Sequence, residues 1–123
     1  MAKVTGLGGV FWKVADSTAT QAWYQEVLGV GGEWGVLFTH RDDTPDGFSQ
    51  VTQFKATTDY FDPSPHMFMV NLRVDDLDEF VIGLEQKGIA ILGRQNEDYG
   101  KFAWILDPDG VKVELFQQIG GTP

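Results

Sequence analysis

The sequence predicts an α+β fold built from two similar β-α-β-β-β units whose curved, mixed sheets enclose one central cavity. Three pairs of matching features recur along the 123 residues at nearly one spacing, 60, 59 and 63 residues apart. They are residues 13–16 with 73–76, Gly29 with Gly88, and the Pro-Asp-Gly turns 45–47 and 108–110. A unit of about 60 residues buries little apolar surface alone, so two such units are expected to pack together.

The first unit, about residues 6–54, begins with a strand over 8–14 that is rich in Val, Phe and Trp. A helix is expected from the cap candidates Asp16 and Ser17 to the terminating Gly29. Two further strands follow, and the turn signal Thr-Pro-Asp-Gly separates them. Their expected ranges are 34–40 and 48–54.

Residues 55–65 form a connection, which Tyr60 and Phe61 are expected to pin to the body of the domain. The second unit, about 66–117, repeats the order, and the tail to residue 123 is expected to be loose. Its helix has one apolar face and runs from the cap candidates Asp75 and Asp76 to Gly88. Its expected strands are 67–74, 89–92, 101–106 and 111–116. The whole chain, 1–123, is therefore interpreted as one domain.

The composition excludes several classes of protein. A formal net charge of −9 disfavours binding to nucleic acid, and the absence of cysteine excludes disulfides and thiolate chemistry. Neither an apolar signal segment nor a run of about 20 apolar residues occurs. We therefore expect a cytoplasmic protein that does not enter the membrane.

Six short segments, in this order and spacing, resemble the vicinal-oxygen-chelate superfamily of glyoxalases, bleomycin-resistance proteins and extradiol dioxygenases. They are GVFWKV at 9–14, AWY at 22–24, VLG at 27–29, LRVDDLD at 72–78, FAWILDPDG at 102–110 and VEL at 113–115. The resemblance covers nearly the whole chain. It implies the glyoxalase-like fold, a small organic ligand and a homodimer.

The resemblance also implies four positions at which related proteins hold a divalent metal, usually through His, Glu or Gln. In this chain they carry Gly9, Thr52, Met69 and Glu114, so Glu114 alone has a typical ligand side chain. Catalytic metal sites usually need about three protein ligands, and a thioether is a poor ligand for hard ions. We therefore expect no cofactor, with Zn, Ni, Mn or Fe as the alternative.

Glu114 is the candidate catalytic residue. Strand alternation puts it with Lys112 and Phe116, on the face opposite the apolar side chains that should meet the helix. A carboxylate facing a partly apolar cleft could act as general base, bind a metal, grip a cationic group, or simply pair with a base such as Lys112. The candidate ligand-binding residues are Phe11, Trp34, Thr52, Met69 and Asn71.

Two functional hypotheses follow, and the sequence leaves open whether the protein is an enzyme. In the first, the protein binds a small organic molecule without a metal, for sequestration, sensing or proton chemistry at Glu114. In the second, it is a metal-dependent lyase, isomerase or dioxygenase that uses Glu114 with a non-standard ligand. His40 and His66 are the only histidines available for that role.

Overall fold

The computed structural model describes residues 2–3, 7–32 and 35–121. The second unit forms a complete β-α-β-β-β motif. Its elements are β1 (Val70–Arg73), α2 (Leu77–Gln86), β2 (Gly93–Glu97), β3 (Gly100–Leu106) and β4 (Lys112–Gln118). The strands make one mixed sheet of order β1-β4-β3-β2, in which β1 runs parallel to β4 and the other neighbours are antiparallel.

The first unit supplies the other helical elements. These are α1 (Ser17–Trp23), the π-helix η1 (Tyr24–Leu28) that continues it, and the short 3-10 helix η2 (His40–Asp42). The predicted caps are confirmed, because the Asp16 and Asp76 carboxylates each accept a hydrogen bond from the backbone N–H three residues on. Gly29 ends η1 with a left-handed φ of 73°, which glycine adopts without steric cost.

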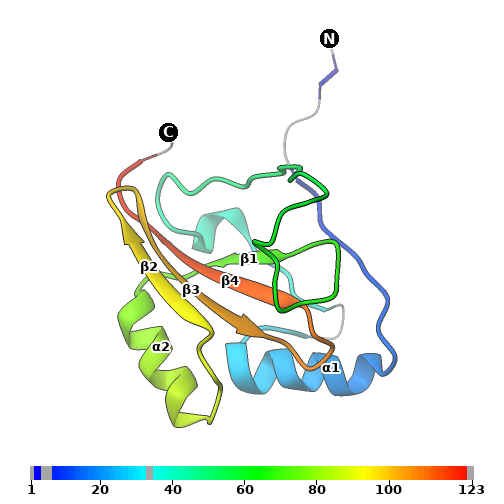
Figure 1. Cartoon of the computed structure of the whole chain (residues 1–123). Coiled ribbons are helices and arrows are strands. Elements are labelled where there is room, and N and C mark those ends of the chain that lie inside the picture. The colour runs from blue at the N-terminus through cyan, green and yellow to red at the C-terminus, as the bar shows by residue number, and fades with distance from the viewer. Residues whose placement is uncertain (1, 4–6, 33–34, 122–123) are drawn as a thin grey trace.

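The core lies between the helices and one face of the sheet. Leu77, Val81 and Leu84 of α2 and the alternate residues Ala103, Ile105, Val113 and Leu115 of β3 and β4 are buried there. Tyr24, Val27 and Leu28 of the first unit join them. Figure 1 shows α1 and α2 on one side of the sheet and the long coil segments of residues 43–65 on the other.

Hydrogen bonds join the two units at the turn between β3 and β4. The buried Asp107 carboxylate accepts from the Tyr24 hydroxyl at 2.9 Å, and the Asp109 carboxylate accepts from the Thr20 hydroxyl at 2.5 Å. At the other end of α1–η1, the Lys87 ammonium donates to the carbonyls of Glu26 and Val27. The first-unit helix is thus fixed to the second unit at both ends.

The strands predicted at 8–14, 34–40 and 48–54 are wrong as paired strands, since no described residue of these ranges belongs to a ladder. The described residues of these ranges lie mostly in irregular coil. A strand is stable only beside a neighbouring strand, with an apolar face to cover. Residues 33–34 lie outside the described part. The Thr44–Gly47 turn is confirmed by a 2.9 Å bond from the Gly47 N–H to the Thr44 carbonyl.

Two strand boundaries in the second unit also differ from the prediction. The strand expected over 67–74 pairs only at Val70–Arg73, and the one expected over 89–92 lies at Gly93–Glu97. Ile89 and Ile91 instead pack against the core as the chain leaves α2. The polar composition of β2 hid it from the hydrophobicity pattern, because an edge strand buries little. No helix of the described residues is long and apolar enough to cross a membrane.

Candidate functional site

Glu114 lies on the sheet face turned away from the helices, as predicted, and is only 7% exposed. Its Oε2 accepts hydrogen bonds from the Tyr60 hydroxyl at 2.5 Å and from the Trp104 indole at 2.8 Å. Its Oε1 accepts from the Asn71 side-chain amide at 2.7 Å. Three donors from β1, β3 and the 55–65 connection therefore share one carboxylate.

Tyr60 is held from both ends by β4. While its hydroxyl meets Glu114, its carbonyl accepts a 2.6 Å hydrogen bond from the Lys112 ammonium. That ammonium also lies 5.2 Å from the centre of the Tyr60 ring and 5.5 Å from that of Trp104, within cation–π range. Burial, followed by the hydrogen bond to Glu114, raises the pKa of Tyr60 well above its usual value.

Aromatic rings continue along the same sheet face. The Phe102 ring stacks on Phe116 with centroids 5.0 Å apart and lies nearly parallel to the Trp104 ring at 6.3 Å. Phe48 meets the edge of Phe116 from the coil above. Aromatic side chains therefore lie beside the polar Glu114 cluster on this face.

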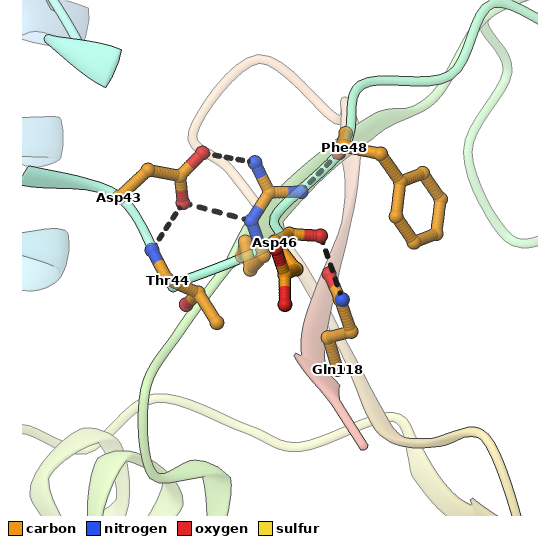
Figure 2. Close-up of polar contacts among 6 residues, drawn as sticks. Asp43, Thr44, Asp46, Phe48 and Gln118 are labelled. Atoms are coloured by element: carbon orange, nitrogen blue, oxygen red, sulfur yellow. Dashed lines mark hydrogen bonds and ion pairs between the residues drawn. The ribbon is translucent and has the colours of Figure 1, made fainter. Parts of the chain in front are cut away.

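A turn of the first unit closes one end of this face. Figure 2 shows the Asp46 carbonyl accepting a hydrogen bond from Gln118 of β4, at 3.0 Å, and the Asp43 carboxylate accepting from the Thr44 N–H. The same carboxylate forms an ion pair with Arg73 of β1, which also donates to the Phe48 carbonyl. The turn is thus anchored to both central and edge strands of the sheet.

Beside the Glu114 cluster lies a pocket of about 460 Å³, within the range of small-molecule sites. The chain from Thr52 to Thr58 and from Phe61 to Met69 encloses it. Its apolar lining comes mainly from Phe54, Phe61, Phe68, Met67 and Met69, and its polar lining includes Thr52, Ser64, His66 and the charged Lys55 and Asp62. Aromatic and thioether side chains suit a mainly apolar, aromatic ligand.

Tyr60 connects the pocket wall to the carboxylate. Its ring stacks on Phe54, with centroids 5.6 Å apart and an interplanar angle of 26°, and Phe54 in turn packs on Phe61 at 5.1 Å. Phe54 and Phe61 line the pocket, whereas the Tyr60 hydroxyl reaches Glu114. The expectation that Tyr60 pins the connection to the domain is confirmed.

The structure sorts the predicted site residues into two groups. Glu114 and Asn71 belong to the carboxylate cluster, and Thr52 and Met69 line the pocket. Phe11 is 93% exposed and does not line this pocket. Trp34 lies outside the described residues.

The implied metal does not fit the side chains at the four positions. Glu114 already serves three donors, Met69 and Thr52 line a pocket that is not the Glu114 cluster, and Gly9 has no side chain to offer. Within residues 2–3, 7–32 and 35–121, no group of three or more His, Cys, Asp or Glu could hold an ion.

Sequence reasoning did not single out Trp104 or Tyr60 as donors to Glu114. It named Lys112 only as a possible ion-pair partner of Glu114, whereas the Lys112 ammonium donates to the Tyr60 carbonyl. A signal for Trp104 was available, because the tight turn after β3 sets the hairpin register that places Trp104 directly opposite Glu114. Lys112 shares the parity of Glu114 on β4. Tyr60 is 54 residues from Glu114, and no local pattern indicates that contact.

Comparison with known proteins agrees with this architecture. The family model described as "Glyoxalase/Bleomycin resistance protein/Dioxygenase superfamily" matches residues 10–115. A protein from the mobile metagenome of V. pseudocholerae is 19% identical, with a TM-score of 0.61 over 98% of this chain and 99% of that one. A domain described by the same superfamily name from a Frankia species is 21% identical, with a TM-score of 0.60 over 98% and 96%.

One similar structure has a stated ligand class. An antibiotic-binding protein from a Streptomyces species is 26% identical, with a TM-score of 0.54 over 86% of this chain and 89% of that one. Among curated proteins, none matches the chain.

Proposed function

Because the chain belongs to the glyoxalase/bleomycin resistance protein/dioxygenase superfamily, we propose that it binds a mainly apolar, aromatic small molecule without a metal ion of its own. The ligand would occupy the pocket of about 460 Å³. The observation that carries this proposal is the division of the site. Aromatic and methionine side chains supply the apolar part of the pocket lining, beside polar residues that include Lys55 and Asp62, while both oxygens of Glu114 are engaged by donors of the protein.

Similarity to the Streptomyces antibiotic-binding protein supports a drug-like ligand. The pocket contributes what such a ligand needs, because Phe54 and Phe61 offer flat apolar contact and Thr52 offers a hydroxyl at its edge. Under this proposal Glu114 maintains the shape of the site. The Asn71 amide in turn orients Glu114 through its 2.7 Å hydrogen bond.

The proposal can be tested with N-phenyl-1-naphthylamine, an uncharged aromatic probe whose fluorescence rises in apolar pockets. We expect saturable binding that EDTA does not change. Thr52→Arg places a long charged side chain in the pocket from an exposed position and should weaken binding about 10-fold or more, equivalent to at least 1.4 kcal/mol. Ile82→Arg, on the exposed side of α2, is the matched control and should bind as wild type.

Two results would contradict this function. One is equal binding by the Thr52→Arg and Ile82→Arg variants, which would place the probe elsewhere. The other is near-stoichiometric Zn, Ni, Mn or Fe in protein purified without a chelating tag, lost in Glu114→Ala. That second result would favour the metal-dependent lyase, isomerase or dioxygenase.

The protein is further proposed to form a homodimer. Several apolar side chains of the first unit are exposed to an extent unusual for a monomer. They belong to segments that pair with no strand of the described structure. They are Val10, Phe11, Leu37, Phe38 and Val51. In a dimer this surface would be covered by the second copy, and Phe11 would gain neighbours. A monomeric mass by light scattering at micromolar concentration would contradict this assembly.

A further inference from the structure

The wall of the pocket is a coil segment that needs an external support. Residues 52–69 form turns closed by their own backbone, such as Lys55 to Thr58 and Phe61 to Ser64. Among the described residues, hydrogen bonds tie this segment to β4 at Tyr60 and to the turn after β3 through the His66 ring and the Asp109 carbonyl. Residues 52–60 are therefore held between the Tyr60 attachment and the turn of residues 43–48, which Arg73 and Gln118 anchor to the sheet.

β4 grips Tyr60 with two side chains that point to the same face. Glu114 accepts from its hydroxyl at 2.5 Å, and Lys112 donates to its carbonyl at 2.6 Å, so the residue is held along its full length. Glu114 is itself oriented from both sides, by Trp104 of β3 and Asn71 of β1. Side chains from three strands of the sheet therefore fix the position of Tyr60, directly or through Glu114.

We propose that Glu114 and Lys112 are positioning residues that set the shape of the ligand pocket through Tyr60. The Tyr60 ring stacks on Phe54 and meets Phe61 edge-on, so fixing Tyr60 also positions these two lining residues. This inference rests on the proposed function for the occupant of the pocket. The attachment of Tyr60 to β4 follows from its hydrogen bonds to Glu114 and Lys112 alone. It assigns Glu114 no contact with the ligand.

A direct role for Glu114 could use only the one acceptor position of its carboxylate that no protein donor occupies, on Oε1, unless a donor is displaced. Tyr60 and Trp104 share Oε2, and Asn71 occupies one acceptor position of Oε1, so a ligand or metal that bound Oε2, or both oxygens, would displace a group of a largely buried cluster. A buried donor left without an acceptor is costly. The carboxylate is better suited to orient neighbouring side chains than to exchange partners in each binding event.

The conservative variant Glu114→Gln separates the two roles. Its amide oxygen can accept from both Tyr60 and Trp104, and its NH₂ group can donate to Asn71 once the Asn71 amide turns over. Glu114→Gln should therefore keep the pocket, whereas Glu114→Ala loses it. A general base at this position would be lost in both variants.

The experiment measures hydrogen exchange of residues 55–65 and probe affinity in the same set of variants. Tyr60→Phe removes the hydroxyl, Lys112→Met removes the ammonium, and Tyr99→Phe is the matched control at an exposed tyrosine. We expect about 10-fold faster exchange in 55–65 for Tyr60→Phe, Lys112→Met and Glu114→Ala, with α2 and β3 unchanged. N-phenyl-1-naphthylamine affinity should fall in parallel, and Glu114→Gln and Tyr99→Phe should match wild type.

The inference is overturned if Tyr60→Phe leaves exchange in 55–65 at the wild-type rate, or if Glu114→Gln is as damaging as Glu114→Ala. Because Tyr60→Phe is a conservative change at a part-exposed residue, it decides the matter even if Glu114→Ala does not fold. If the wild-type protein fails to bind the probe, the proposed function fails. The exchange measurement still decides whether β4 positions the segment.

Discussion

The substitution Asp107→Ala should lower the free energy of unfolding by about 4 kcal/mol. The Asp107 carboxylate is 4% exposed and accepts three hydrogen bonds, from the backbone N–H groups of Asp109 and Val111 and from the Tyr24 hydroxyl. Hydrogen bonds to a charged group contribute roughly 1.5–3 kcal/mol each. The Asp109 N–H is part-exposed and can bond to water when the carboxylate is removed, so losing that bond should cost little. The estimate of about 4 kcal/mol therefore comes from the two buried donors, the Val111 N–H and the Tyr24 hydroxyl, at about 2 kcal/mol each.

Two variants separate the hydrogen bonds from the bulk of the side chain. Asp107→Asn keeps an oxygen for both backbone donors, and its NH₂ group faces a Tyr24 hydroxyl that can rotate to accept. It should cost about 1 kcal/mol, and Tyr24→Phe, which removes one bond, about 1–2 kcal/mol. Urea unfolding at pH 7, followed by circular dichroism, measures all three.

A double-mutant cycle gives the decisive comparison. Tyr24 and Asp107 belong to different units, so their coupling reports how strongly the first-unit helix is held to the second. We expect a coupling of at least about 1 kcal/mol, because two residues that share a hydrogen bond are not independent. Additive effects, or an Asp107→Ala variant as stable as Asp107→Asn, would refute the assignment of this carboxylate as the joint between the units.

Three further predictions concern pH and packing. Burial and the hydrogen bond to Asp107 raise the pKa of Tyr24 above its unfolded value near 10. The free energy of unfolding should therefore fall as pH rises beyond about 10, and it should fall less in Tyr24→Phe. Urea unfolding at a series of pH values from 9 to 11.5 measures the difference. The hydrogen bonds from Arg73 lower the pKa of Asp43, so stability from this pair should be lost as pH falls below about 4, and Asp43→Asn should flatten that acid limb. Leu84→Ala should cost about 3 kcal/mol in urea unfolding, since Leu84 is buried between α2 and the sheet.

Sequence patterns predicted the second unit well because its signals are local. Asp76 caps α2 and the Asp-Pro-Asp-Gly turn closes the β3–β4 hairpin as expected. The same signals in the first unit predicted the α1 start at Asp16, the Gly29 stop and the turn at Thr44–Gly47. They could not decide whether the extended stretches pair, because pairing depends on a sheet edge that the sequence does not place.

The candidate site shows a similar boundary between what local pattern can and cannot predict. Parity placed Glu114 correctly on the face opposite the helices, and the spacing around the turn could have placed Trp104 beside it. The roles of Thr52 and Met69 as ligand-binding residues stay predictions, though both line one pocket. The position of Tyr60 depends on the path of a coil segment, for which neither period nor propensity carries information.

The hydrogen bonds of Glu114 bear on what a carboxylate at this position can do. A carboxylate has about four acceptor positions, and three of those on Glu114 face donors of the protein itself. A side chain engaged in this way stabilises the geometry around it and is poorly placed to bind anything new. The residue type that made Glu114 a candidate metal ligand is equally the type that best organises three neutral donors. Its partners, more than its identity, therefore determine its role, and fold membership locates the pocket without fixing the reaction.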